Sequence, residues 1–251
     1  MEDIKRGVIL FVFGFLGIAS LAFFIPHLLS FQTAALPISV EVVQVLSTIQ
    51  SSVLLFLMIW LGLTFSKKVG LTAPVVASWA RLESGFEAFK PQIIPALIGG
   101  IVGGLFLLAF FGLFTNYLPA EFLTAGENLT LPWYAKILYG GITEEILIRW
   151  GLMSFLVWGI YWLTQKNGSE VRPHNYIIAV IVSALVFGLG HLPVVFALTS
   201  EVTVSLVIYI VLGNAFFGFI AGYLFWKRGL ECAIIAHMVA HFTMILAAGF
   251  S

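Results

Sequence analysis

The sequence contains few charged residues. It has 12 Lys and Arg and 12 Asp and Glu among 251 residues, which is 10% of the chain and a formal net charge of zero. No run of basic residues occurs, although such runs are typical of nucleic-acid binding and of surfaces that attract anionic lipid. We therefore expect no nucleic-acid partner and no basic surface for anionic lipid.

The chain also has a single cysteine and little sequence outside its apolar segments. Cys232 is the only cysteine, which excludes an internal disulfide and leaves no cysteine-based indication of the redox compartment. A chain of 251 residues accommodates about seven spans of roughly 20 residues with short connections, so no room is left for a separate soluble domain. We expect one integral membrane domain over residues 1–251, with its chemistry in a core at about 93–250.

Apolar residues dominate the chain. They make up 61% of it, and the mean hydropathy of +1.07 lies far above that of soluble globular proteins. Apolar segments of spanning length lie at 7–30, 43–65, 93–116, 133–164, 175–199, 203–226 and 229–250. The sequence predicts an all-α fold, a polytopic membrane helical bundle with about seven transmembrane helices. The alternative is eight helices, if 66–92 or 117–132 enters the bilayer.

The basic residues outside the spans predict the orientation. Connections 31–42, 117–132 and 200–202 contain no Lys or Arg, whereas the opposite side carries Lys5, Arg6, Lys67, Lys68, Arg81, Lys90, Lys166, Arg172, Lys227 and Arg228. Because cytoplasmic loops are rich in Lys and Arg, we expect a multi-pass protein of the plasma membrane with a cytoplasmic N-terminus and an external C-terminus.

The connection 66–92 carries its own helical signal. The residues that recur at roughly helical spacing are Val75, Val76, Trp79, Leu82, Phe86 and Phe89. This spacing predicts a helix at the membrane interface, either a gate beside the site or a simple connection between two spans; we favour the connection.

Ionisable residues cluster inside the predicted spans. A charged side chain at the bilayer centre costs about 2.5–3.5 kcal/mol on insertion scales, so each one suggests a function. The cluster consists of Glu144, Glu145, Arg149, His191, His237 and His241.

The spacing within this cluster suggests roles. Glu145 and Arg149 are four residues apart and can pair on one helix face, as a structural ion pair or as part of the chemistry. Glu144 points about 100° away and is left as the candidate general base. His237 and His241 also share a face and can act on one small ligand.

Two kinds of chemistry fit these residue types. One carboxylate with three imidazoles can activate water and stabilise an oxyanion, which is what amide hydrolysis requires. Glu144, His191, His237 and His241 could equally ligate zinc with a water in an open position, so zinc stays an open alternative and no other cofactor is indicated.

Three sequence motifs resemble those of a known family. Glu144-Glu145-Ile146-Leu147-Ile148-Arg149 resembles the EExxxR motif of the CAAX protease and bacteriocin-processing family of membrane proteins. Phe187-Gly188-Leu189-Gly190-His191 resembles its FxxxH motif, and the stretch from Gly218 to His237 resembles its terminal region, which ends in HxxxN or HxxxD. The motifs occur in the family's order, each on its own span, within about residues 93–246.

The resemblance implies an intramembrane endopeptidase of seven or eight helices and assigns roles. Glu144 would activate water with His191, His237 and residue 241 would hold the oxyanion, and Glu145 with Arg149 would orient the site. This sequence departs from the family at His241, where Asn or Asp is usual. A neutral imidazole still donates one hydrogen bond, and it adds a metal ligand, so both the glutamate-type and the metallo-type mechanism stay open.

Three functions compete on this evidence. The first is a membrane endopeptidase acting on lipidated protein tails, or on membrane-associated peptide precursors in bacteriocin processing or immunity. The second is a non-catalytic immunity or partner-binding protein of the same fold, which the intact Glu144, His191 and His237 argue against. The third is a proton-coupled transporter, which we rank last because no inverted repeat is evident.

Overall fold

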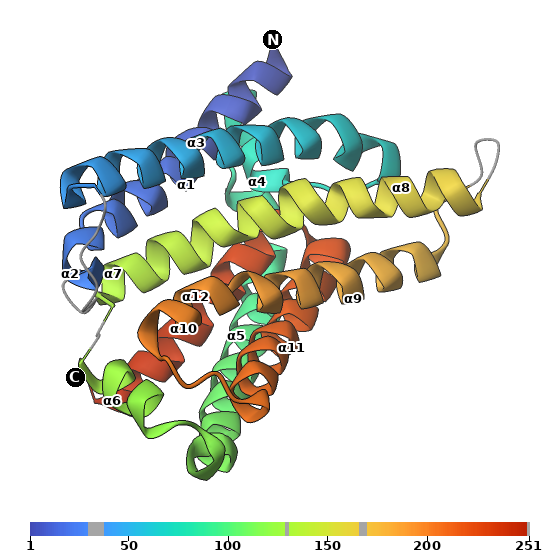
Figure 1. Cartoon of the computed structure of the whole chain (residues 1–251). Coiled ribbons are helices and arrows are strands. Elements are labelled where there is room, and N and C mark those ends of the chain that lie inside the picture. Colours follow the sequence, from blue (N-terminus) through green and yellow to red (C-terminus); the bar gives the residue numbers. More distant parts are fainter. Residues whose placement is uncertain (30–37, 129–130, 166–169, 250–251) are drawn as a thin grey trace.

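The protein is a bundle of helices in the part of the chain that the structure describes. The computed structural model describes residues 1–29, 38–128, 131–165 and 170–249, and no strand occurs in them (Figure 1). In these residues seven helical segments are long and apolar enough to cross a membrane. The predicted all-α polytopic bundle is confirmed. Residues 30 and 250 and Lys166, which entered the predicted spans and orientation, lie outside the described residues.

The spans are built from both single and composite helices. The first two contain α1 (Glu2–Ala22), α2 (Ile25–Leu29), α3 (Val40–Phe65) and η1 (Ser66–Val69). After α4 (Pro74–Ala80), the third contains α5 (Phe86–Phe114) and η2 (Thr115–Tyr117), and α6 (Ala120–Asn128) follows. The fourth joins α7 (Trp133–Ala135), η3 (Lys136–Glu144), η4 (Ile146–Met153) and α8 (Ser154–Thr164). The remaining spans contain α9 (Pro173–Gly190), α10 (Leu192–Leu198), α11 (Val204–Arg228) and α12 (Leu230–Ala248).

The helix predicted in the connection 66–92 is present but short. It is α4, which is only seven residues long, and Val75 and Val76 are buried in the bundle. The chain then turns at Leu82, whose φ of 63° is left-handed, and α5 starts at Phe86, earlier than the predicted 93. Of the apolar residues in the pattern, Val75 and Val76 face the bundle, whereas Trp79, Leu82 and Phe86 are exposed.

Helix α12 lies at the centre of the packing. It contacts α5, α11, η3 and η4, while α1 and α3 pack on the fourth span and α9 packs on α11 (Figure 1). Small residues allow the closest approaches. A Cβ on Gly100 of α5 would lie 2.5 Å from the Ala236 carbonyl oxygen of α12, and one on Gly218 of α11 would lie 2.9 Å from Ala184 of α9.

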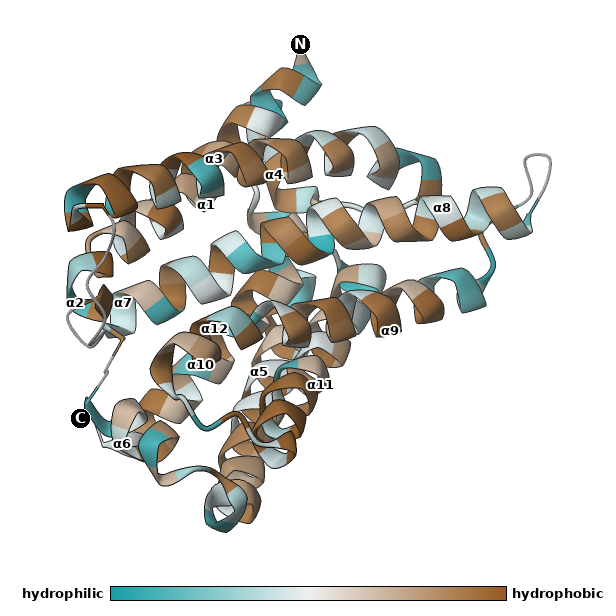
Figure 2. Cartoon of the chain, viewed as in Figure 1, coloured by the Kyte–Doolittle hydropathy of each residue, from teal (hydrophilic) through white to brown (hydrophobic). Residues whose placement is uncertain are grey.

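The outer surface suits a lipid environment. Large apolar side chains are exposed along α1, α3, α5 and α9, and hydrophobic colour runs along most helices while hydrophilic colour concentrates near their ends (Figure 2). Phe56, Ile94 and Val204, for example, are each more than 60% exposed. Such exposure is costly in water but neutral against lipid tails, as expected for a multi-pass membrane protein.

A polar clasp joins α6 to the end of α10. The Glu121 carboxylate accepts hydrogen bonds from the Thr199 and Ser200 hydroxyls, each at 2.9 Å, and from the Ser200 N–H at 2.8 Å. These bonds, led by the one from the Ser200 side chain, lower the pKa of Glu121 below its ordinary value. Since His191 directly precedes α10, the clasp anchors the far end of the segment that begins beside the site.

Acidification is expected to release this clasp. Because the pKa of Glu121 is lowered on folding, its contribution is complete above the ordinary Glu value of about 4.3 and is lost as the pH falls through the lowered value. Hydrogen exchange at the Ser200 amide, corrected for intrinsic rates, measures the release. The Leu206 amide, which donates to the non-titrating Thr203 hydroxyl, is the control. Equal pH responses at both amides would contradict the prediction.

Candidate active site

The fourth span changes its helical type where the candidate residues begin. Segments η3 and η4 are π-helical and flank Glu145, so their backbone bonds run from i to i+5 and their turns are wide. The sequence predicted an ordinary α-helix here. The difference was not visible in the sequence because residues four apart, such as Glu145 and Arg149, are neighbours in both types of helix. Wide helical turns are rare and often lie at functional sites.

Helix α1 packs directly on this stretch. The Thr143 hydroxyl donates to the Gly14 carbonyl at 2.8 Å, and a Cβ on Gly17 would lie 2.1 Å from the same hydroxyl oxygen. Only glycine fits so close to a neighbouring side chain. The first span therefore supports the helix that carries the two glutamates.

Glu145 and Arg149 form a fully buried ion pair. The Arg149 Nε lies 3.1 Å from the Glu145 Oε2, and both side chains are 0% exposed. The guanidinium also stacks over the Phe187 ring, at 5.2 Å from its centroid. The spacing-based expectation of this pair is confirmed. Among the described residues, none of the Arg149 side-chain nitrogens has a hydrogen-bond partner, and neither has the Glu145 Oε2, so the attraction between the two charges holds the pair.

The same glutamate holds His237. The His237 Nδ1 lies 2.9 Å from the Glu145 Oε1, in a contact between residues 92 positions apart in sequence. A carboxylate accepts only, so Nδ1 carries the proton and donates, which leaves Nε2 free to face a ligand. Rings of Phe187 and Phe217 pack against the imidazole and fix its plane. Glu145 therefore orients a histidine as well as neutralising an arginine.

Glu144 and His191 face each other in the more open part of the cluster. The His191 Nε2 lies 4.0 Å from the Glu144 Oε1, and the side chains are 34% and 19% exposed. The His191 Nδ1 lies 2.8 Å from the Phe187 carbonyl oxygen and donates to it. The lone pair on Nε2 is thereby directed toward Glu144.

His241 stacks on His237 and abuts η3. The two rings lie 4.8 Å apart at an interplanar angle of 14°. On the other side, a Cβ on Gly140 would lie 2.4 Å from the His241 Nε2. The structure thus gathers the six predicted residues around the fourth span, as one inner group of Glu145, Arg149 and His237 and one outer pair of Glu144 and His191, with His241 beside His237.

Alanine at Gly140 is expected to impair the site without unfolding the bundle. The added Cβ would displace the His241 ring, which stacks on His237, so we expect a fall in peptide-cleavage rate of about tenfold or more with a small loss of stability. Gly159→Ala in α8 is the matched control, because a Cβ there meets nothing within 4 Å. Cleavage rates and thermal unfolding of both variants measure the effect. Equal rates for the two would contradict it.

The proposed zinc ligands do not form a metal-binding set in the described residues. No group of three or more His, Cys, Asp or Glu side chains is arranged there to hold a metal ion. Glu144 and His191 stand 4.0 Å apart, and His237 is held by Glu145 instead of by Glu144. We therefore assign no step of the chemistry to zinc.

Sequence reasoning missed the part played by Phe187. Its carbonyl accepts from His191, and its ring packs against His191, His237 and Arg149. Phe187 is the first residue of the FxxxH motif and lies one helical turn before His191, which is the only sequence signal for this role. It connects the outer pair to the inner group.

Comparison with known proteins identifies the region that holds this site. Residues 126–243 match the family model of type II CAAX prenyl endopeptidases described as Rce1-like. The matched range is slightly less than half of the chain. The match confirms the resemblance, and all six candidate residues lie within it. The family is one of membrane-embedded proteases, which supports an intramembrane CAAX-type endopeptidase at family level. No curated protein and no solved structure matches the chain.

The Rce1-like match does not include the whole of the predicted core. It begins at residue 126, whereas we expected the chemistry-bearing core to begin at about 93. Helix α5 therefore lies outside the matched range although it packs closely on α12. Helices α1 and α3 also lie outside it and support the fourth span from the other side.

Proposed function

We propose that this protein hydrolyses peptide bonds in membrane-associated peptides or in the tails of lipidated proteins, with Glu144 as the general base. The observation that supports this most directly is the pair of Glu144 and His191, which face each other at 4.0 Å as the partly exposed groups beside a buried, oriented histidine. A water molecule that is hydrogen-bonded to both groups would lie about 2.8 Å from each.

The reaction begins with this water. Glu144 accepts a proton while the water oxygen attacks the carbonyl carbon of the scissile bond, and His191 orients the water through its Nε2 lone pair. The carbonyl oxygen becomes an oxyanion. Glu144 then gives the proton to the amide nitrogen, the C–N bond breaks, and a carboxylic acid and an amine leave.

His237 and His241 serve the oxyanion in this scheme. His237 presents Nε2 because its Nδ1 is held by Glu145, and in its protonated form that nitrogen donates a hydrogen bond. His241 stacks beside it and adds a second donor. Glu145 and Arg149 do not touch the substrate and act as positioning residues, since Arg149 holds Glu145 and Glu145 holds His237.

The orientation in the membrane is part of the proposal. Asp3 pairs with Lys67, and Arg81 lies 3.5 Å from Glu2, so the predicted cytoplasmic residues of three segments gather at one end of the bundle. A plasma-membrane protein with a cytoplasmic N-terminus is consistent with this clustering.

Cleavage of a membrane-peptide library in proteoliposomes tests the proposal. The wild type should cut at least one peptide, and Glu144→Ala, Glu144→Gln and His237→Ala should not. Parallel reactions with a chelator separate the mechanisms, because loss of activity there would favour a metallo-type enzyme over the glutamate type. If no peptide is cut and Glu144→Gln retains the protein's role in cells, the fold serves as a non-catalytic immunity or partner-binding protein.

A further inference from the structure

A cavity of about 490 Å³ lies at the end of the bundle near the N-terminus, apart from the candidate active site. It is lined by parts of α1, η1, α4, α5 and η4 and by the connection between η1 and α4. This volume is within the range of small-molecule sites. None of the six candidate catalytic residues lines it, so its occupant is independent of the proposed reaction.

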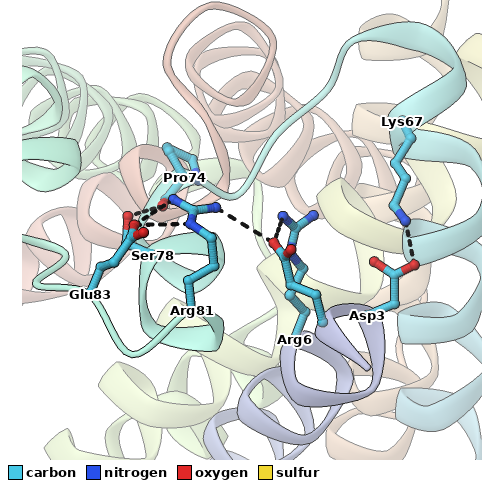
Figure 3. A network of polar contacts seen from close by, with 8 residues as sticks. Asp3, Arg6, Lys67, Pro74, Ser78, Arg81 and Glu83 are labelled. Carbon is cyan, nitrogen blue, oxygen red and sulfur yellow. Dashed lines mark hydrogen bonds and ion pairs between the residues drawn. The ribbon is translucent and has the colours of Figure 1, made fainter.

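The charged residues that line the cavity are all basic. They are Arg6, Lys67 and Arg81, and no Asp or Glu belongs to the lining in the described part of the chain. Their partners Glu2, Asp3 and Glu83 stand outside the lining and hold the cations in place (Figure 3). Arg81 is the most constrained, with Glu83 at 2.8 Å and Glu2 at 3.5 Å. The carboxylates thus orient the cations without entering the cavity.

The three cations keep unused hydrogen-bond donors. Each guanidinium has five N–H groups and the ammonium has three, far more than the few that the carboxylates accept. The Arg6 Nε is buried and has no hydrogen-bond partner among the described residues. The side chains of Lys67 and Arg81 remain 50% and 43% exposed, so they are accessible to a ligand. An anion with several acceptor oxygens is the ligand that these donors fit.

Most of the remaining lining is apolar, and Ser66, Thr72 and Ser78 are its uncharged polar residues. Leu71, Ala73 and Val76 are buried residues of its wall, and Trp150 of η4, the residue after Arg149, also lines it. Partly exposed cations beside buried apolar residues would suit a ligand that has an anionic group joined to an apolar part. The cavity also lies where α1 and η1 reach the ends of their spans, which is the depth of lipid headgroups.

We propose that this cavity binds the phosphate headgroup of an anionic glycerophospholipid from the leaflet on the N-terminal side. Basic pockets between transmembrane helices are known to hold such headgroups. The absence of a basic run in the sequence led us to expect no such surface, but Arg6, Lys67 and Arg81 come from three separate segments that only the fold brings together.

Lipid binding by purified protein tests the proposal. The wild type, delipidated and returned to nanodiscs, should show a higher unfolding temperature with phosphatidylglycerol than with phosphatidylcholine, and should retain phosphatidylglycerol in native mass spectrometry. Lys67→Gln with Arg81→Gln removes two cations and should weaken retention by about thirtyfold. The matched control is Lys90→Gln with Arg172→Gln, which removes two cations of the same predicted side that do not line the cavity and should retain the lipid.

A second variant keeps the test decisive if the cation variant folds poorly. Ala77→Phe fills the cavity while leaving every charge in place, so it should lose the lipid as well. Equal stabilisation by both lipids, equal loss in the control pair, or full retention by Ala77→Phe would each overturn the proposal. Inorganic phosphate or glycerol phosphate that stabilises as strongly as the lipid would do so too, since the ligand would then be a soluble phosphate ester.

Discussion

Replacing Glu144 with glutamine is expected to lower kcat for peptide cleavage by on the order of 10²–10⁴-fold. Glutamine keeps the size and shape of the side chain but cannot accept a proton from water. Among the ion pairs of the described residues, Glu144 takes part only in the one with His191, at 4.0 Å. A neutral side chain of the same size should therefore leave the packing intact. Cleavage rates and thermal unfolding in detergent, measured on the same preparations, separate the two effects.

A second substitution shows whether Glu144 and His191 act on one water. If they do, adding His191→Ala to Glu144→Gln should reduce the rate by no more than about threefold further, because groups that act as a unit are not additive. Glu87→Gln is the matched control, since Glu87 is exposed at the start of α5 and distant in sequence from the motifs. Independent, multiplying losses from the two substitutions would contradict a shared water.

Replacing Arg149 with methionine is expected to destabilise the protein by about 3–5 kcal/mol. The substitution leaves the Glu145 carboxylate charged, buried and without its cation, at a position where both side chains are 0% exposed. Removing one partner of a buried ion pair is far more costly than removing both. Glu145→Gln together with Arg149→Met should therefore recover much of the lost stability.

The matched control for this effect is an exposed ion pair. Arg81 and Glu83 lie 2.8 Å apart with side chains 43% and 56% exposed, and breaking such a pair costs at most about 1 kcal/mol. Unfolding of the wild type, Arg149→Met, the double variant and Glu83→Gln in detergent with increasing SDS provides the comparison. Similar losses for Arg149→Met and Glu83→Gln would show that burial does not set the contribution of the inner pair.

The double variant also separates stability from positioning. With Glu145 and Arg149 both neutral, His237 loses the carboxylate that orients its Nδ1. Stability should recover while the cleavage rate stays low. A double variant that recovers both would contradict the positioning role that we propose for Glu145.

The spans were predictable because lipid imposes length and hydropathy on each of them. Segment 133–164, for instance, appears in the structure as Trp133–Thr164. The pair of Glu145 and Arg149 was predictable as well, since residues four apart on a helix are neighbours whatever surrounds them. Both inferences depend on local sequence alone.

Other features depend on contacts that no local pattern records. The hydrogen bond between Glu145 and His237 joins two spans, and the residue spacing within either span does not predict it. The π-helical turns of η3 and η4 were not predictable because residues four apart are neighbours in an α-helix and in a π-helix, so their spacing does not distinguish the two. The cavity lined by Arg6, Lys67 and Arg81 likewise exists only after three segments meet.

The division of the site between distant spans has a consequence for biogenesis. Spans are inserted as they are synthesised, so Glu144 and His191 reach the membrane before α12 supplies His237 and His241. Until α12 docks, the Glu145 and Arg149 pair lacks its third partner, and His241 is not yet beside Gly140. On the roles that we propose, a nascent chain would hold the general base without its oxyanion donors. The proposed reaction would then become possible only when α12 joins the bundle.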